Sequence, residues 1–249
     1  MDKSFRKKVL EGDRLIGTML TIGHQAVAES LSEIGFDWLF VETEHAPILP
    51  DCLHSIVLAA GPTPCLVRLS RNDEVSIKRA LDAGAAGIIA PKVNSVETTE
   101  RVVKFAKFPP EGIRGVGVSR ASKYGLNLQN YVRSANDGIT VVLQVEDYEA
   151  VENLEEIVAV RGVDAIFIGP YDLSASIGRT GDLAHPEVQE LIMAAKTICA
   201  NKRMSVGIFE SQAANVDKWT KEGFSLFAVS TDISCLINEG KSLLELISL

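Results

Sequence analysis

The sequence predicts an α/β protein, a single (β/α)8 barrel in which eight parallel strands are each followed by a helix. Eight short apolar runs recur along the 249-residue chain, with helical patterns between them. The runs show no apolar–polar alternation, as expected of parallel strands that are covered on both faces. Eight such units in about 250 residues match the size of this barrel, and we expect one domain over residues 1–249. A doubly wound open sheet is the alternative, although open sheets usually have fewer strands.

The predicted elements follow one another along the chain. Strands are expected at Gly17–Leu20, Trp38–Glu42, Cys65–Leu69, Gly87–Pro91, Thr140–Glu146, Ala165–Gly169, Ser205–Phe209 and Leu226–Ser230. Helices are expected within residues 25–35, 73–84, 95–108, 147–160, 185–202 and 211–223, after a first helix near the N-terminus. Three of these patterns end at a glycine, which readily takes the left-handed backbone angles that stop a helix.

The connection from Pro91 to Thr140 is longer than the others. It holds one predicted helix and then a stretch that includes EGIRGVGVSRAS, residues 111–122. Long loops usually have a functional or interface role. The backbone N–H groups of this stretch could hold a phosphate or carboxylate, and a subunit contact is the alternative. It matches neither a Walker A motif nor a dinucleotide fingerprint, so we expect no nucleotide cofactor.

The composition is that of a soluble globular protein. The formal charge of −8, without runs of Lys or Arg, disfavours binding to nucleic acid or to an anionic membrane. No apolar stretch approaches the roughly 20 residues of a membrane span, and the N-terminus lacks an apolar signal core. The four cysteines are widely spaced with no CxxC motif, which predicts reduced thiols and a cytoplasmic protein.

Polar side chains gather where the predicted strands end, the face on which barrel enzymes place their active sites. They are Glu42, Glu44 and His45 after the second strand, Arg68 on the third, Lys92 after the fourth, Gln144 and Glu146 on the fifth and Asp172 after the sixth. Several polar groups are therefore expected at one mouth of the barrel.

Glu146 and Asp172 follow neighbouring strands. Such strands lie about 4.8 Å apart, so the two carboxylates can reach one point. Two carboxylates with several waters are a common way to hold Mg²⁺ or Mn²⁺. The alternative is that both acids sit at helix N-termini and face the helix dipole.

Three more side chains suit chemistry at this mouth. Gln144 lies two residues before Glu146 and shares its face of the strand. Arg68 lies within a strand, and a buried guanidinium needs an anion, either a structural acid or a substrate oxyanion. His45 at the lip could carry protons, because an unperturbed imidazole has a pKa of about 6.5.

Together these residues resemble the HpcH/HpaI aldolase family of metal-dependent pyruvate aldolases. The matching stretches are VETEHAP, VRLSRND, ALDAGAAGIIAPKV, FPPEGIRGVG, LQVED and VDAIFIGPYDLSASIG, in family order. The resemblance covers roughly residues 15–235. It implies a (β/α)8 barrel of the phosphoenolpyruvate/pyruvate type, commonly a homohexamer built as a dimer of trimers with the last helix exchanged between subunits.

The resemblance also implies roles for individual residues. A divalent ion, Mg²⁺, Mn²⁺ or Co²⁺, would bind Glu146 and Asp172, and pyruvate would chelate it. Backbone amides at Tyr171 and Asp172 would hold the pyruvate carboxylate, Arg68 would steady the C2 oxygen, and Gln144 would hydrogen-bond nearby. His45 would act as the base, assisted by Asp82 of a neighbouring subunit.

Two residues depart from the family pattern. Glu42 stands where the family often has Asp, at a position thought to touch metal-bound water. Tyr171 stands where a smaller Ala is expected, so its ring narrows the entrance and changes which aldehyde fits.

The sequence thus predicts a class II aldolase, a carbon–carbon lyase. It would reversibly cleave a 4-hydroxy-2-oxo acid, dicarboxylic or sugar-derived, to pyruvate and an aldehyde through an enolate. Neither pyridoxal phosphate nor a Schiff-base lysine is expected, although Lys92 lies near the mouth. The alternatives are a lyase acting on a CoA thioester, in the manner of citrate lyase β-subunits, and a non-catalytic metabolite-binding barrel.

Overall fold

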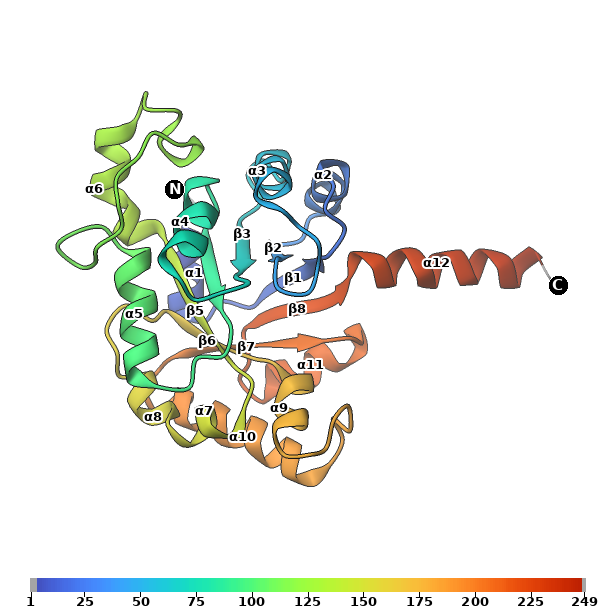
Figure 1. Cartoon of the computed structure of the whole chain (residues 1–249). Helices are drawn as coiled ribbons and strands as arrows, with labels where there is room; N and C mark the ends of the chain where they lie inside the picture. Colours follow the sequence, from blue (N-terminus) through green and yellow to red (C-terminus); the bar gives the residue numbers. More distant parts are fainter. Residues whose placement is uncertain (1–3, 248–249) are drawn as a thin grey trace.

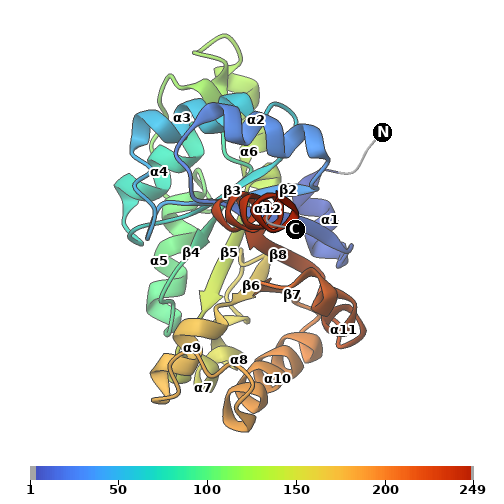
Figure 2. The same cartoon turned by 90° about the vertical axis from the view of Figure 1, so that its right-hand side faces the viewer.

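Eight parallel strands close into a barrel (Figure 1 and Figure 2). The computed structural model describes residues 4–247. The strands are β1 (Leu15–Leu20), β2 (Trp38–Glu42), β3 (Cys65–Arg68), β4 (Gly87–Ala90), β5 (Thr140–Val145), β6 (Ala165–Ile168), β7 (Ser205–Glu210) and β8 (Leu226–Thr231). Each strand pairs with the next, and β8 pairs with β1. The predicted barrel is confirmed, and the closure between β8 and β1 excludes the open sheet.

Helices surround the barrel. They are α1 (Phe5–Glu11), α2 (Gln25–Ile34), α3 (Pro50–Ala59), α4 (Glu74–Asp82), α5 (Val96–Ala106), α6 (Leu128–Gly138), α7 (Tyr148–Glu152), α8 (Leu154–Ile157), α9 (Pro170–Ser176), α10 (Pro186–Asn201), α11 (Val216–Lys221) and α12 (Asp232–Ile247). Each of the six predicted helical ranges contains a helix, and the range 147–160 holds two short ones. By contrast, α3, α6, α9 and α12 lie outside these six ranges.

Large aromatic side chains fill the barrel interior. The Trp38 ring lies 6.1 Å from that of Phe40, and the Phe40 ring lies 5.5 Å from that of Phe167, measured between centroids. Glycines make room for them: a Cβ added at Gly17 would lie 2.6 Å from the Trp38 ring, and one at Gly207 would lie 2.6 Å from Phe167. These rings form a dry, close-packed floor beneath the mouth of the barrel.

The other end of the barrel is closed by α1. The Phe5 ring lies 6.5 Å from the Trp38 ring, and Arg6 Nη2 donates a 2.8 Å hydrogen bond to Asp164, which is buried. The cysteines Cys52, Cys65, Cys199 and Cys235 are all free, as predicted. No helix within residues 4–247 is long and apolar enough to cross a membrane.

The last helix, α12, projects from the mouth of the barrel instead of packing along its side (Figure 1). It is anchored at its first residue, where the buried Asp232 carboxylate accepts hydrogen bonds from the backbone N–H groups of Thr21 and Ile22. Beyond that anchor its apolar side chains are exposed: Ile233, Leu236, Ile237, Leu243, Leu244, Leu246 and Ile247. The helix therefore carries an apolar face that its own barrel does not cover.

Candidate active site

A cavity of about 320 Å³ opens at the C-terminal ends of the strands, on the face where the sequence predicts the site. It is lined by Met19, Phe40, His45, Arg68, Gln144, Phe167, Gly169, Pro170, Tyr171, Asp172 and Phe209. Five of these, His45, Arg68, Gln144, Tyr171 and Asp172, are predicted site residues. The apolar lining residues come from the barrel interior and from β7. They were not predicted as site residues, because the sequence prediction relied on polar side chains at strand ends.

Arg68 is held between two acids at the ends of β2 and β3. The strand register places Glu42 beside Arg68, and their side chains form a buried ion pair. Glu44 Oε2 lies 3.5 Å from Arg68 Nε, and that Nε has no hydrogen-bond partner among residues 4–247. The guanidinium therefore has the structural anion that was one of the two alternatives from the sequence. The other alternative, a substrate oxyanion, stays a prediction.

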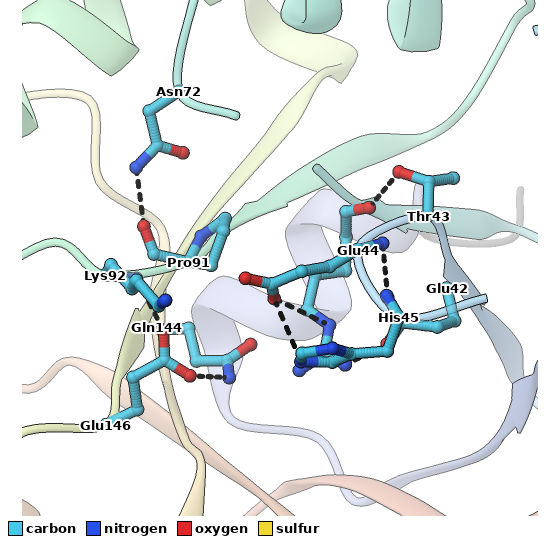
Figure 3. Close-up of polar contacts among 10 residues, drawn as sticks. Glu42, Thr43, Glu44, His45, Asn72, Pro91, Lys92, Gln144 and Glu146 are labelled. Atoms are coloured by element: carbon cyan, nitrogen blue, oxygen red, sulfur yellow. Dashed lines mark hydrogen bonds and ion pairs between the residues drawn. The ribbon is translucent and has the colours of Figure 1, made fainter. Parts of the chain in front are cut away.

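Glu42 also shapes the loop that follows β2. Its Oε1 accepts the backbone N–H of Glu44 at 2.6 Å and that of His45 at 3.1 Å. Figure 3 shows this loop with Glu44 and His45 on the side of the site opposite Gln144 and Glu146. The His45 ring lies at the rim, 68% exposed, with Nε2 3.9 Å from Glu44 Oε2. This exposure leaves the imidazole accessible to a bound molecule.

Glu146 is buried next to Gln144, one of the residues that line the cavity. Its Oε1 accepts the backbone N–H of Lys92 at 2.6 Å, and its Oε2 accepts a hydrogen bond from Gln144 (Figure 3). Lys92 makes this contact with a φ of +50°, an uncommon angle for a residue other than glycine. The Lys92 residue is exposed, and it does not line the cavity.

Burial raises the pKa of Glu146 to about 7. The negative charges of Asp172 and Glu44 add to this rise, because they disfavour a third charge nearby. The N–H of Lys92 and the charge of Arg68 oppose it. A cation bound beside this carboxylate would favour its ionised form.

The bend after β6 brings Asp172 to this point. β6 ends at Ile168, Gly169 caps α9, and Pro170 occupies the first turn, where its missing N–H costs nothing. Asp172 lies in the same turn and lines the cavity. A Cβ added at Gly169 would lie 2.9 Å from Gln144 Nε2 and 3.1 Å from Glu146 Cβ. The backbone of this bend therefore approaches the two side chains closely, and any larger residue here would displace them.

These residues fit a hard divalent cation. No three His, Cys, Asp or Glu side chains within residues 4–247 group as a complete set of metal ligands. An octahedral ion nevertheless needs only one or two carboxylates when waters complete its shell. Gln144 Oε1 is a buried oxygen without a hydrogen-bond partner among the described residues. The donor set of Glu146, Asp172 and this amide oxygen consists of the oxygen ligands that Mg²⁺ and Mn²⁺ prefer.

Asp82 does not join these residues within one chain. It lies in α4, where its Oδ1 accepts a 2.7 Å hydrogen bond from Arg114, and it lines a different cavity. The Arg114 side chain is fully buried, and its guanidinium stacks 4.6 Å from the centroid of Phe108. The glycine-rich stretch 111–122 thus supplies a structural arginine, a role that its pattern alone did not indicate.

A closed (β/α)8 barrel with acids, an arginine and an exposed histidine at the C-terminal ends of its strands has the arrangement of a barrel enzyme. The model of the HpcH/HpaI aldolase/citrate lyase family matches residues 16–239, and the chain belongs to this family. It is an aldolase, a carbon–carbon lyase.

Individual relatives agree with the family match. The chain is 39% identical to a 2-dehydro-3,6-dideoxy-6-sulfogluconate aldolase of Pseudomonas putida, covering 92% of this chain and 91% of that protein. It is 36% identical to a 4-hydroxy-2-oxo-heptane-1,7-dioate aldolase of Escherichia coli, covering 98% and 94%. A crystal structure of an HpcH/HpaI family protein from Burkholderia cenocepacia superposes with a TM-score of 0.94 at 31% identity, over 98% of both chains.

Proposed function

We propose that this aldolase depends on a divalent metal ion and reversibly cleaves a 4-hydroxy-2-oxo acid to pyruvate and an aldehyde. The observation that carries the proposal is that Arg68, Gln144 and Asp172 line one cavity, with Glu146 hydrogen-bonded to Gln144 beside it. Two relatives support the substrate class, because one is named for a heptane-1,7-dioate and the other for a 6-sulfogluconate derivative. Both named substrates carry a second acidic group, as the dicarboxylic or sugar-derived substrate predicted here would.

Glu146 and Asp172 would hold the ion, with Gln144 beside it. Mg²⁺, Mn²⁺ and Co²⁺ all suit such oxygen ligands. When bound, the ion supplies a Lewis acid that polarises the ketone and eases removal of a proton from the neighbouring carbon. Glu42 already accepts two backbone N–H groups and pairs with Arg68. Its predicted contact with metal-bound water would add to these bonds.

The chain's own side chains orient the substrate. The backbone N–H groups of Tyr171 and Asp172 would bind the pyruvate carboxylate in the first turn of α9. Arg68 would donate to the C2 oxygen through its guanidinium, which lines the cavity. Negative charge grows on that oxygen in the transition state, so a donor placed there accelerates the reaction.

His45 would move the proton, and its exposure at the rim leaves it free to do so. Asp82, held by Arg114, would support the imidazole from a neighbouring subunit, because in its own chain it lies at another cavity. This arrangement requires an assembly, and the exposed apolar face of α12 favours one in which the last helix packs on a neighbour. A homohexamer, a dimer of trimers, in the cytoplasm is the form we propose.

The alternatives have less support. A lyase acting on a CoA thioester needs a basic site for the adenine nucleotide, and no motif of this chain suggests one. A non-catalytic barrel would tolerate loss of the acids, whereas Glu146, Asp172 and Arg68 are all in place.

Pyruvate release tests the proposal. Purified protein is incubated with a 4-hydroxy-2-oxo dicarboxylic acid, and pyruvate is measured with lactate dehydrogenase and NADH. We expect cleavage with Mg²⁺, Mn²⁺ or Co²⁺ that stops on addition of EDTA and returns with excess metal. Equal rates with and without EDTA would refute the metal-dependent mechanism.

A further inference from the structure

A second cavity adjoins the candidate active site. It measures about 450 Å³ and shares Pro170, Tyr171 and Phe209 with the first cavity. The shared rings of Tyr171 and Phe209 lie 6.5 Å apart and tilt by 56°, and they form a wall that borders both spaces. The helices on its far side, α10 and α11, lie with α9 on the same side of the barrel (Figure 1). The second cavity is therefore a neighbour of the candidate active site.

The polar groups in the second cavity divide into two sets. Glu210 accepts hydrogen bonds from Trp219 Nε1 at 2.9 Å and from the backbone N–H of Gln212 at 2.8 Å. Gln189 donates to the Leu183 carbonyl at 2.8 Å. The carboxylate and one amide are therefore engaged with the protein itself.

The remaining polar groups are free to meet a ligand. No carboxylate within residues 4–247 lies at ion-pair distance from Lys218, and the described residues offer the Asn215 side chain no hydrogen bond. The Lys218 ammonium lies 4.9 Å from the centroid of the Trp219 ring, a cation–π contact that keeps it beside the cavity. The unengaged lining thus presents a positive charge and N–H donors.

We propose that this second cavity binds the far end of the aldehyde, and that Lys218 selects aldehydes that carry a distal anionic group. The Tyr171–Phe209 wall sets the length of the chain that reaches it, because a short aldehyde stays on the pyruvate side. The inference rests on the proposed function, since it assigns a subsite to the second substrate of the same reaction. The chemical class is a short aldehyde with a terminal carboxylate or sulfonate.

Two matched aldehydes test the subsite. 4-Oxobutanoate carries a distal carboxylate, and butanal has four carbons and no charge. The kcat/KM for addition of pyruvate is measured for each with the metal-loaded enzyme. Wild-type enzyme should prefer 4-oxobutanoate, and this preference should weaken as the salt concentration rises because the Lys218 charge is exposed.

The variant Lys218→Met removes the charge and keeps most of the side-chain length. We expect the ratio of the two kcat/KM values to fall roughly fivefold, the effect of one exposed ion pair, mainly through the KM for 4-oxobutanoate. Lys218→Arg should restore most of the ratio. Lys221→Met is the control, because Lys221 lies on the same helix outside the cavity lining and should leave the ratio unchanged.

An unchanged ratio in Lys218→Met, or the same fall in Lys221→Met, would overturn the subsite. Exchange of the pyruvate methyl protons with D₂O, measured without aldehyde, separates this failure from failure of the proposed function. Exchange by the wild-type enzyme together with an unaltered ratio would refute the subsite alone. Absence of both exchange and addition would refute the proposed function and the subsite with it.

Discussion

At the scale of single residues, the site is a balance of charges. Glu42, Glu44 and Glu146 surround a single guanidinium, Arg68, while Asp172 adds a further negative charge. The arginine neutralises part of this charge and, in the proposed function, also donates an N–H to the substrate. An arginine suits both tasks because its planar group donates in several directions at once.

Replacing Arg68 with Lys tests this double role. The ammonium keeps a positive charge beside Glu42 but loses the fork of donors, so we expect kcat for cleavage to fall roughly 100-fold, as for loss of one transition-state donor. Circular dichroism and the melting temperature should stay close to wild type. Turnover within a few-fold of wild type would remove Arg68 from the transition state.

Glu146 predicts how stability depends on pH. Its pKa rises from 4.5 to about 7 on folding, so the folded chain holds the proton more tightly than the unfolded chain. In metal-free protein the group therefore costs stability as pH rises through this window, on the order of 3 kcal/mol once it is ionised. The stability of Glu146→Gln should not show this pH dependence, and bound metal should suppress it in the wild-type protein.

Thermal unfolding without metal, between about pH 5 and pH 8, measures this difference. The melting temperature of the wild type should fall relative to Glu146→Gln as the pH increases. Added Mg²⁺ should raise the melting temperature of the wild type most at the alkaline end and leave the variant nearly unchanged. Parallel curves of melting temperature against pH for the two metal-free proteins would show that burial does not raise the pKa of Glu146.

At the scale of elements, the ends of the strands could be predicted, whereas the turns that connect them to the next helices could be predicted only in part. The apolar run through Ile168 and the Gly169–Pro170 pair predict where β6 stops. A helix N-terminus at Asp172 was one of the two alternatives from the sequence, and Asp172 does lie in the first turn of α9. The pattern of α9 alone is too brief to recognise, whereas α6 is longer but its polar sequence buries only Ala135.

Gly169→Ala tests the turn that connects β6 to α9. The new Cβ would press on Gln144 Nε2 and Glu146 Cβ, so both side chains must shift. We expect metal affinity, measured by titration calorimetry, to fall about tenfold or more, since misplaced ligands bind poorly.

Gly138→Ala is the matched control for that variant. A Cβ at Gly138, the last residue of α6, meets nothing within 4 Å, so metal binding should be unchanged. Equal affinity for metal in Gly169→Ala and Gly138→Ala would mean that the close approach at Gly169 plays no part in the site.

At the scale of the whole molecule, the barrel follows from the sequence, whereas the assembly does not. Apolar runs and glycine stops define eight strands, and a parallel sheet of this size has few ways to cover both faces. The pairing of Asp82 with Arg114, and the distance of Asp82 from His45 in one chain, depend on contacts between remote segments. A pattern read along the chain carries no signal for such contacts.

The apolar face of α12 predicts the consequence of blocking assembly. Replacing both Leu236 and Leu243 with Glu places charges where a neighbour would pack, so sedimentation should show smaller species than wild type. Activity should fall in parallel, because Asp82 of the neighbour would be withdrawn from His45. Lys241→Glu, which alters charge on α12 without removing an apolar side chain, should leave both unchanged.

The central claim is that this barrel activates pyruvate on a metal held by Glu146 and Asp172. Proton NMR of pyruvate in D₂O tests it most directly, with Mg²⁺ or Mn²⁺ and then with EDTA, paramagnetic metal being removed before acquisition. We expect the methyl signal to disappear with wild-type enzyme only when metal is present, and to persist with Glu146→Gln. Retention of the methyl signal by the wild-type enzyme with every metal, or exchange that survives EDTA, would contradict it.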